Sequence, residues 1–398
     1  MTAHPQGLLC LLLAAALAPA AGSLAAETFE FRLTSTTNTQ QSMNFVWCRP
    51  GASTSPVPPG VVSARAIVFR DADLPTPAPV VADEAKGTGT GYTHLRVDLD
   101  GNGQLDPNES LALIAHGSKF LEIPPFVCRV ADAGHRHNVT FYGSLNLMNP
   151  EPMLDLCTRL AYEGTGRLTD RDVWLSLRDN NGNGRVADTT NNLLSGEGAV
   201  LAFSILPDAS QTNQLAFARA IGLFGRTYTT AVAFEGGEDS PTAVLKLTET
   251  NPPKGVLTFA GSNVLSIALV DPTNEMAVLV QVAGDRAEVP VGIWQAKDVT
   301  VREADCSFRA DLRYGRAQES LVIREGAMAS LQLGGPLRPG LRVGGNLSSP
   351  VLSLSLEPSS GVSGEEYVPV DSRGRQSAGW ILRRPGGPAV AAGQFEFG

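Results

Sequence analysis

The sequence is poor in basic and aromatic residues. Its 398 residues include 31 Lys and Arg against 40 Asp and Glu, which gives a formal net charge of −9 at pH 7. Only 6% of the residues are aromatic. A chain with this balance lacks the positive surface that nucleic-acid binding requires, and anionic membrane surfaces repel it. We therefore expect no nucleic-acid partner.

The motifs of common catalytic centres are missing as well. The chain has no GxSxG elbow, no HExxH zinc motif, no Walker A loop and no Rossmann glycine fingerprint. The glycine-rich segment 87–91 precedes a predicted strand instead of following one, so it is expected to be a turn and not a phosphate-binding loop. Carboxylate pairs for glycoside hydrolysis need no sequence proximity, and that chemistry stays open. The sequence favours a binding protein over an enzyme without deciding between them.

Histidine is scarce, with five in the chain, and only one pair is closely spaced. His135 and His137 flank a single residue, so both imidazoles could leave one face of a strand. No Asp, Glu or Cys stands nearby at a recognisable zinc spacing. We expect these two histidines to lie on the surface and to hold no metal.

Long apolar runs are confined to the N-terminus. Residues 1–26 contain no Lys, Arg, Asp or Glu, and Leu8–Leu17 is an apolar run followed by small residues. This pattern predicts a signal peptide over residues 1–25, with an uncleaved membrane anchor as the alternative. No later segment reaches the length of a spanning helix, so we expect no membrane insertion of the mature chain. The predicted location is secreted, either extracellular or periplasmic.

Cysteine is also rare, and one of the five lies inside the predicted signal peptide. An even number of cysteines in an exported chain favours disulfide bonds. Four cysteines allow three pairings, and the sequence does not choose among them. The four that remain, expected to form two disulfides, are Cys48, Cys128, Cys157 and Cys306.

Short runs of alternating apolar and polar residues dominate the rest of the chain. Gly, Pro, Asn or Asp bound most of these runs, which is the pattern of β-strands joined by turns. The fold class that we predict is mainly β, as several small sandwich-like modules. The clearest strand segments are 29–33, 66–69, 95–97, 173–177, 276–280, 352–356 and 395–397.

One segment, 149–164, is predicted to form a short helix. Asn149 can cap it, Pro150 suits the first turn and Gly164 can end it. Met153, Leu156, Cys157 and Leu160 would form its apolar stripe. A weaker helical pattern covers 215–221.

Composition changes divide the mature chain into four predicted modules. Residues 251–254 and 334–340 are rich in Pro or Gly and are expected to act as linkers. The C-terminal module has the strand spacing of a small immunoglobulin-like β-sandwich. The predicted modules are 26–148 with a first calcium loop, 149–250 with the helix and a second calcium-like loop, 255–337, and 341–398.

The residues 98–109, with the sequence DLDGNGQLDPNE, carry the strongest chemical signal. They resemble the twelve-residue calcium loop of the EF-hand family, with oxygen-bearing side chains at positions one, three, five, nine and twelve and Gly103 at position six. Ca²⁺ takes six to eight oxygens, which a tight loop supplies by turning alternate residues inward. The resemblance implies a calcium site with the ligands Asp98, Asp100, Asn102, Gln104 through its carbonyl, Asp106 and Glu109.

The resemblance stops at the loop. The preceding residues 92–97 have the pattern of a strand, where the family has a helix, and Ser110 follows where an apolar residue is usual. A helix–loop–helix pair that opens on binding calcium is therefore not expected.

A second loop, 179–188, repeats part of the pattern. Oxygen-bearing side chains again occupy positions one, three and five, and Gly184 occupies position six. Position nine is Ala187, and no Glu stands at position twelve. We expect weaker calcium binding here, or a hairpin turn without an ion. The candidate ligands are Asp179, Asn181, Asn183, Arg185 and Asp188.

Two such loops on a β scaffold, with segment 225–228 and the ending GQFEFG, loosely resemble uncharacterised exported bacterial proteins. Two hypotheses about function follow. The first is an exported calcium-binding protein of structural or adhesive type, with a carbohydrate or a cell-surface component as a candidate partner. The second is a secreted hydrolase or carbohydrate-binding protein in which the calcium loops are accessory.

Overall fold

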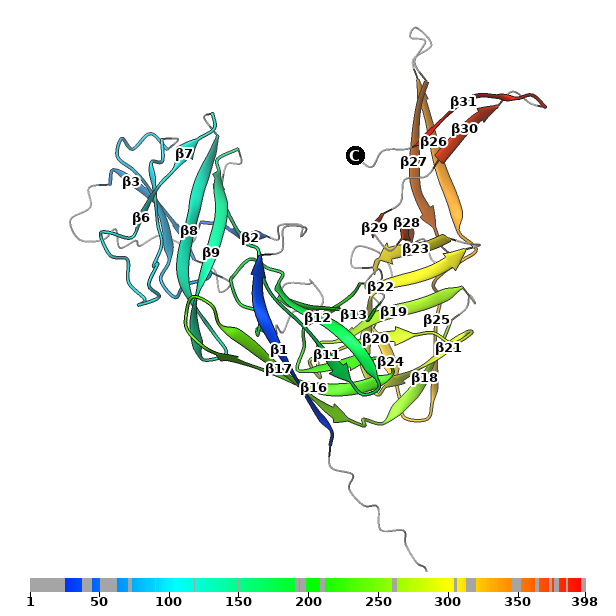
Figure 1. Ribbon diagram of the computed structural model, residues 1–398. Coiled ribbons are helices and arrows are strands. Elements are labelled where there is room, and N and C mark those ends of the chain that lie inside the picture. Colours follow the sequence, from blue (N-terminus) through cyan, green and yellow to red (C-terminus); the bar gives the residue numbers. More distant parts are fainter. Residues whose placement is uncertain are drawn as a thin grey trace, which may run out of the picture.

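The computed structural model of the chain is built from β-strands (Figure 1). No α-helix occurs in the part of the chain that it describes, and the predicted mainly-β class is confirmed. The predicted signal peptide and the strand expected at 395–397 lie outside that part. The described residues are 26–394 except 38–44, 51–62, 71–73, 90, 118, 149–150, 190–192, 194–197, 208–211, 260–262, 304–305, 313–319, 346–351, 362–364, 372–373, 376–378 and 384–385.

A first hydrophobic core lies between two antiparallel sheets. One sheet has the order β2-β10-β9-β8-β7 and the other β3-β4-β5-β6, and both contribute buried side chains such as Phe69 and Phe141. The strands are β2 (Phe45–Cys48), β3 (Arg65–Phe69), β4 (Val80–Glu84), β5 (His94–Arg96), β6 (Ser110–Ala112), β7 (Ile114–Ala115), β8 (Phe120–Asp132), β9 (His135–Asn146) and β10 (Met153–Thr158).

A second core is enclosed by strands that follow β10, together with β1 from the start of the described chain. β1 pairs with β11 on one side and with β17 on the other, which brings Phe31 and Leu33 into this core. The strands are β1 (Thr28–Thr37), β11 (Leu160–Leu168), β12 (Arg171–Asp179), β13 (Ala199–Ile205), β14 (Asn213–Ala216), β15 (Ala220–Leu223), β16 (Arg226–Glu235) and β17 (Thr242–Thr250). One face each of two later strands, 264–271 and 276–281, also contributes to this core.

A third core gathers around Trp294, which is fully buried. β23 pairs with β28, and Tyr367 of β28 belongs to the same core. The strands that contribute to it are β18 (Lys254–Phe259), β19 (Val264–Asp271), β20 (Met276–Gln281), β21 (Arg286–Pro290), β22 (Gly292–Glu303), β23 (Cys306–Asp311), β24 (Leu321–Ile323), β25 (Met328–Leu331) and β28 (Glu366–Asp371). The other strands of this part of the chain are β26 (Arg338–Gly345), β27 (Leu352–Ser360), β29 (Gly374–Arg375) and the hairpin β30 (Gly379–Arg383) and β31 (Ala389–Gln394).

The predicted helix at 149–164 is wrong. Its described residues form β10 and the first part of β11. Leu154 and Leu156 alternate into the first core, while β2 and β9 pair with the two edges of β10. The apolar residues fit either a helical or a strand period, and the two neighbouring strands decide the outcome. The weaker pattern at 215–221 likewise becomes β14 and β15.

The predicted disulfides are also wrong, because no disulfide joins the four described cysteines. Cys48 lies opposite Leu154, whereas Cys157 lies opposite Phe45, so an odd offset places the two cysteines on opposite faces of the sheet. Cys128 is three strand spacings from Cys48, roughly 14 Å, well beyond the reach of a disulfide. Cys306 is exposed on a different sheet.

Over the described residues there is no helix with the length and apolar character needed to cross a membrane.

Candidate metal centre

The first predicted calcium loop is the connection of the β5–β6 hairpin. The register pairs His94 with Ala112 and Arg96 with Ser110, so residues 97–109 form the turn between the two strands. Asp98 and Glu109 thus stand near paired strand ends, which brings loop positions one and twelve together. A strand precedes the loop, as the sequence predicts, and another strand follows it.

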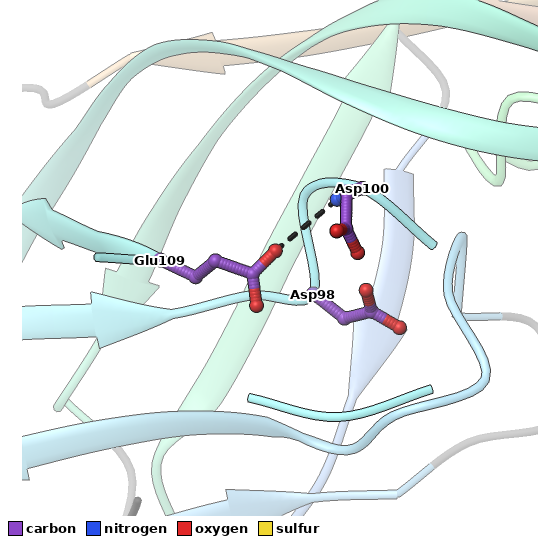
Figure 2. A group of neighbouring side chains, drawn as sticks. All are labelled: Asp98, Asp100 and Glu109. Atoms are coloured by element: carbon purple, nitrogen blue, oxygen red, sulfur yellow. Dashed lines mark hydrogen bonds between the residues drawn. The ribbon is translucent and has the colours of Figure 1, made fainter. Parts of the chain in front are cut away.

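Three carboxylates of this loop converge (Figure 2). Asp98, Asp100 and Glu109 each place one oxygen so that all three lie within 4.8 Å of one another. The side chains of Asp98 and Glu109 are buried, and Asp100 is exposed. None of the ion pairs among the described residues involves these carboxylates. Such a cluster can bind a metal ion, because a cation would relieve the repulsion between partly buried negative charges.

Backbone amides of the loop hold the two buried carboxylates in place. Asp98 accepts hydrogen bonds from Asn102 N at 3.0 Å and from Gly103 N at 2.8 Å. Glu109 accepts from Leu99 N at 2.7 Å and from Asp100 N at 3.1 Å, the latter drawn as the dashed line in Figure 2. Gly103 has φ +86°, a conformation that side chains rarely adopt, which explains glycine at loop position six. These amides fix the orientation of the two carboxylates.

The pKa of Asp98 is raised. Burial is the largest cause, the nearby charge of Glu109 adds to it, and hydrogen bonds from Gly103 and Asn102 act in the opposite direction. A cation would favour the charged form of Asp98, so a proton and a cation compete for this carboxylate.

Hydrogen bonds link two of the remaining predicted ligands, Asn102 and Asp106, to Asp100 through the amide of Asn102. Asn102 Nδ2 donates to Asp100 Oδ2 and to Asp106 Oδ2, both at 3.2 Å. Asn102 Oδ1 accepts from Gln104 N at 2.7 Å. The three polar side chains at positions three, five and nine therefore form one network beside the buried carboxylates.

Strand β8 donates two hydrogen bonds to the backbone of the loop. Arg129 N donates to Leu99 O at 2.8 Å, and Cys128 Sγ donates to Asp98 O at 3.2 Å. Burial and the charge of Asp98 raise the pKa of the Cys128 thiol, which favours its protonated form. Cys128 is therefore a hydrogen-bond donor to the loop backbone.

The second predicted loop follows β12 and leads toward β13, with Asp179 paired to Ala199. Its glycines at positions four and six, Gly182 and Gly184, have φ +75° and +79°, close to the +68° and +86° of their counterparts in the first loop. Asn183 Oδ1 accepts from Arg185 N at 2.8 Å, as Asn102 does from Gln104. The two loops therefore share a local backbone conformation.

Asp188 takes the place of the missing acidic residue at position nine. Its Oδ2 accepts from Asn183 Nδ2 at 2.9 Å, which parallels the bond between Asn102 and Asp106. The carboxylates of Asp132, Asp179 and Asp188 do not meet the 4.8 Å spacing of the first cluster. The residue at position twelve, Thr190, lies outside the described residues.

One residue at the second loop was not predicted from the sequence. Asp132, at the end of β8, accepts from Val186 N at 2.7 Å and from Ala187 N at 3.1 Å. It is buried, and burial raises its pKa against the effect of these hydrogen bonds. Asp132 is 54 residues from Val186 along the chain, and no local motif links the two.

The histidine pair does not lie as expected, because His137 is fully buried. Its ring lies 5.1 Å from the ring of Phe234 and 6.4 Å from that of Tyr162. Burial, with a smaller contribution from His135, lowers the pKa of His137 to about 4. The predicted absence of a histidine metal site remains a prediction.

The glycine-rich segment 87–91 connects β4 and β5 and binds a carboxylate of the chain itself. Glu84 accepts hydrogen bonds from Thr88 N at 2.7 Å and from Gly89 N at 2.6 Å, and it also contacts the Thr88 hydroxyl. Burial raises the pKa of Glu84, but these hydrogen bonds outweigh it and the net shift is downward. The segment is a turn, as predicted, and its backbone amides bind the side chain of Glu84.

Comparisons of the chain with protein-family models, with curated proteins and with solved structures give no match.

Proposed function

We propose that this chain is an exported calcium-binding protein of structural or adhesive type, in which Ca²⁺ stabilises the loop between β5 and β6. The observation that carries the proposal is the convergence of Asp98, Asp100 and Glu109 within 4.8 Å at loop positions one, three and twelve.

The donor set favours calcium over other divalent ions. Every candidate ligand in the loop offers oxygen, which suits a hard cation, whereas zinc and copper sites are usually built with nitrogen or sulfur. The side chains of Asp98, Asp100, Asn102 and Asp106, the carbonyl of Gln104 and both oxygens of Glu109 would supply about seven ligands. Magnesium prefers about six at shorter distances and keeps several waters.

A structural role follows from where the loop sits. An ion held by the loop would connect the ends of β5 and β6 and, through Leu99 and Asp98, would fix the loop on β8. The loop entrance is formed by strands, which leaves no pair of helices to open and close. Weak sites of this kind are filled at the millimolar calcium concentrations found outside cells.

Calorimetric titration with Ca²⁺ tests the proposal. Glu109→Gln removes one charge and one of two carboxylate oxygens at position twelve, so we expect the affinity of this site to fall at least about tenfold, or about 1.4 kcal/mol. Glu288→Gln, on the exposed side of β21, makes the same chemical change away from the loop and should leave binding unchanged. An isotherm that is identical for Glu109→Gln and the parent would refute the site.

A further inference from the structure

We infer that the second loop, residues 179–188, is a separate divalent-cation site that joins the first core to the second. Asp179, Asn181, Asn183 and Asp188 would supply its side-chain oxygens. The inference does not depend on ion binding at the first loop, because the second has its own ligands and its own place in the fold.

Three of the four candidate ligands are buried, and Asp188 is partly buried. Asp179 is 6% exposed and Asn183 is 1% exposed. Asp179 accepts from Gly182 N and from Gly184 N, both at 2.8 Å, which curls the loop around its carboxylate. Asn183 connects this turn to Asp188 through its amide at 2.9 Å.

The negative charge of this loop is weakly compensated. Neither Asp179 nor Asp188 belongs to any ion pair among the described residues. The charge of Arg185 acts on Asp188, but its Nη2 donates to Leu74 O at 3.4 Å and forms no ion pair with either carboxylate. A bound cation would stabilise both charged forms.

An independent observation points to a missing ligand. Asn181 at loop position three is 7% exposed, and its Nδ2 has no hydrogen-bond partner in the described structure. Its Oδ1 accepts one long hydrogen bond, from Asn183 N at 3.4 Å, and keeps a second lone pair that a cation could use. A buried polar atom without a partner is destabilising.

The loop lies where the two cores meet. The β8–β9 hairpin belongs to the first core and β12 to the second. Asp132 of β8 binds the loop amides of Val186 and Ala187, and a side chain at Gly184 would approach Phe141 Cζ to 2.8 Å. Asp132 is therefore a positioning residue, and an ion in the loop would stiffen the contact between the two cores.

Asp132 also accounts for the absent glutamate of the second loop. In the first loop, Glu109 accepts from Asp106 N, the amide at position nine, at 2.9 Å. In the second loop, Asp132 accepts from Ala187 N, the corresponding amide, at 3.1 Å. The carboxylate of Asp132 thus accepts a hydrogen bond from the position-nine amide of the second loop, as Glu109 at position twelve does in the first loop.

The test is a calcium titration of the chelator-treated full chain and its variants by calorimetry, with Ca²⁺ alone as the probe. We expect two sites in the parent, and we expect Glu109→Gln to retain the second. Asn181→Leu keeps the number of side-chain heavy atoms but removes the oxygen, so it should weaken the second site at least about tenfold.

Asp188→Asn provides a second variant at the same site, and Asp172→Asn, exposed on β12, is the matched control. Loss of one site in Asn181→Leu and Asp188→Asn, with the control unchanged, supports the inference. If both variants bind as many ions as the parent, or if Glu109→Gln binds none, the second site is refuted. If the first loop alone fails, the parent shows one site that Glu109→Gln leaves intact.

Discussion

Individual carboxylates in this protein differ in what compensates their charge. Asp98 and Glu109 are buried without a basic partner and depend on amides such as Gly103 N and Leu99 N. Asp83, by contrast, pairs with Arg96 at 2.6 Å, and both side chains are nearly buried. The guanidinium of Arg96 compensates the charge of Asp83. The three converging carboxylates of the loop have no such partner, and a cation could balance their charge.

His137 provides a prediction about pH. Its folded-state pKa of about 4 lies below the ordinary histidine value of about 6.5, so between these values the unfolded chain binds more protons. The contribution of His137 to stability is complete above about pH 6.5 and is lost as the pH falls toward about 4. His137→Gln should therefore lose less stability than the parent between pH 7 and pH 5.

Urea unfolding at both pH values, in saturating calcium, measures this difference. His116→Gln, at an exposed histidine, is the matched control and should follow the parent. Equal losses of stability in His137→Gln and the parent would mean that the buried imidazole does not titrate in this range.

At the scale of elements, strands with clear alternation were predictable and ambiguous ones were not. Segments 29–33 and 173–177 alternate regularly and lie in β1 and β12. Segment 153–160 carries apolar residues that fit two periods, and one of its two partner strands, β2, comes from distant sequence. The choice between helix and strand there depends on contacts that no local window contains.

The same reasoning separates the two loops. All ligands of the first loop lie within twelve consecutive residues, so residue type and spacing were sufficient to find Asp98, Asp100 and Glu109. The second loop is bound by Asp132 of the β8–β9 hairpin, which is 54 residues from Val186 along the chain. The sequence pattern also predicted that His137 lies on the surface. His137 is instead buried against Phe234, a tertiary contact that sequence spacing does not reveal.

Gly184 allows a test of how closely the second loop packs on the β8–β9 hairpin. Gly184→Ala adds a Cβ at φ +79° that would lie 2.8 Å from Phe141 Cζ. Gly225→Ala adds one at φ +80° with no atom within 4 Å. Both substitutions carry the conformational cost of about 1 kcal/mol, and Gly184→Ala should lose at least about 1 kcal/mol more through crowding.

Denaturant unfolding of the two glycine variants gives the comparison directly. Equal losses would show that the second loop does not press against the first core. A larger loss in Gly184→Ala alone assigns the difference to the contact with Phe141.

At the scale of the whole molecule, three hydrophobic cores follow one another along the chain and are joined by sheet pairing and loops, not by disulfides. β1 contributes to the second core although the first core follows it in sequence. The two acidic loops both contact the end of β8, at Arg129 and at Asp132. A cation bound in either loop would therefore stabilise the meeting point of the first and second cores.

The absence of disulfides leads to a prediction about reductant. Because the register keeps Cys48 and Cys157 on opposite faces, the melting temperature should be the same with and without dithiothreitol. Differential scanning calorimetry under both conditions is sufficient. A fall in the melting temperature with reductant would mean that bridges form in a different strand register.

The most direct test of calcium binding as a structural function is the melting temperature of the parent chain in calcium and in chelator. A ligand that binds only the folded state at about one hundred times its dissociation constant stabilises it by about 2.7 kcal/mol, so we expect calcium to raise the melting temperature by about 5 °C. Glu109→Gln should show a smaller rise, since it weakens the cluster of Asp98, Asp100 and Glu109. Identical melting curves of the parent in calcium and in chelator would contradict a structural role for the ion.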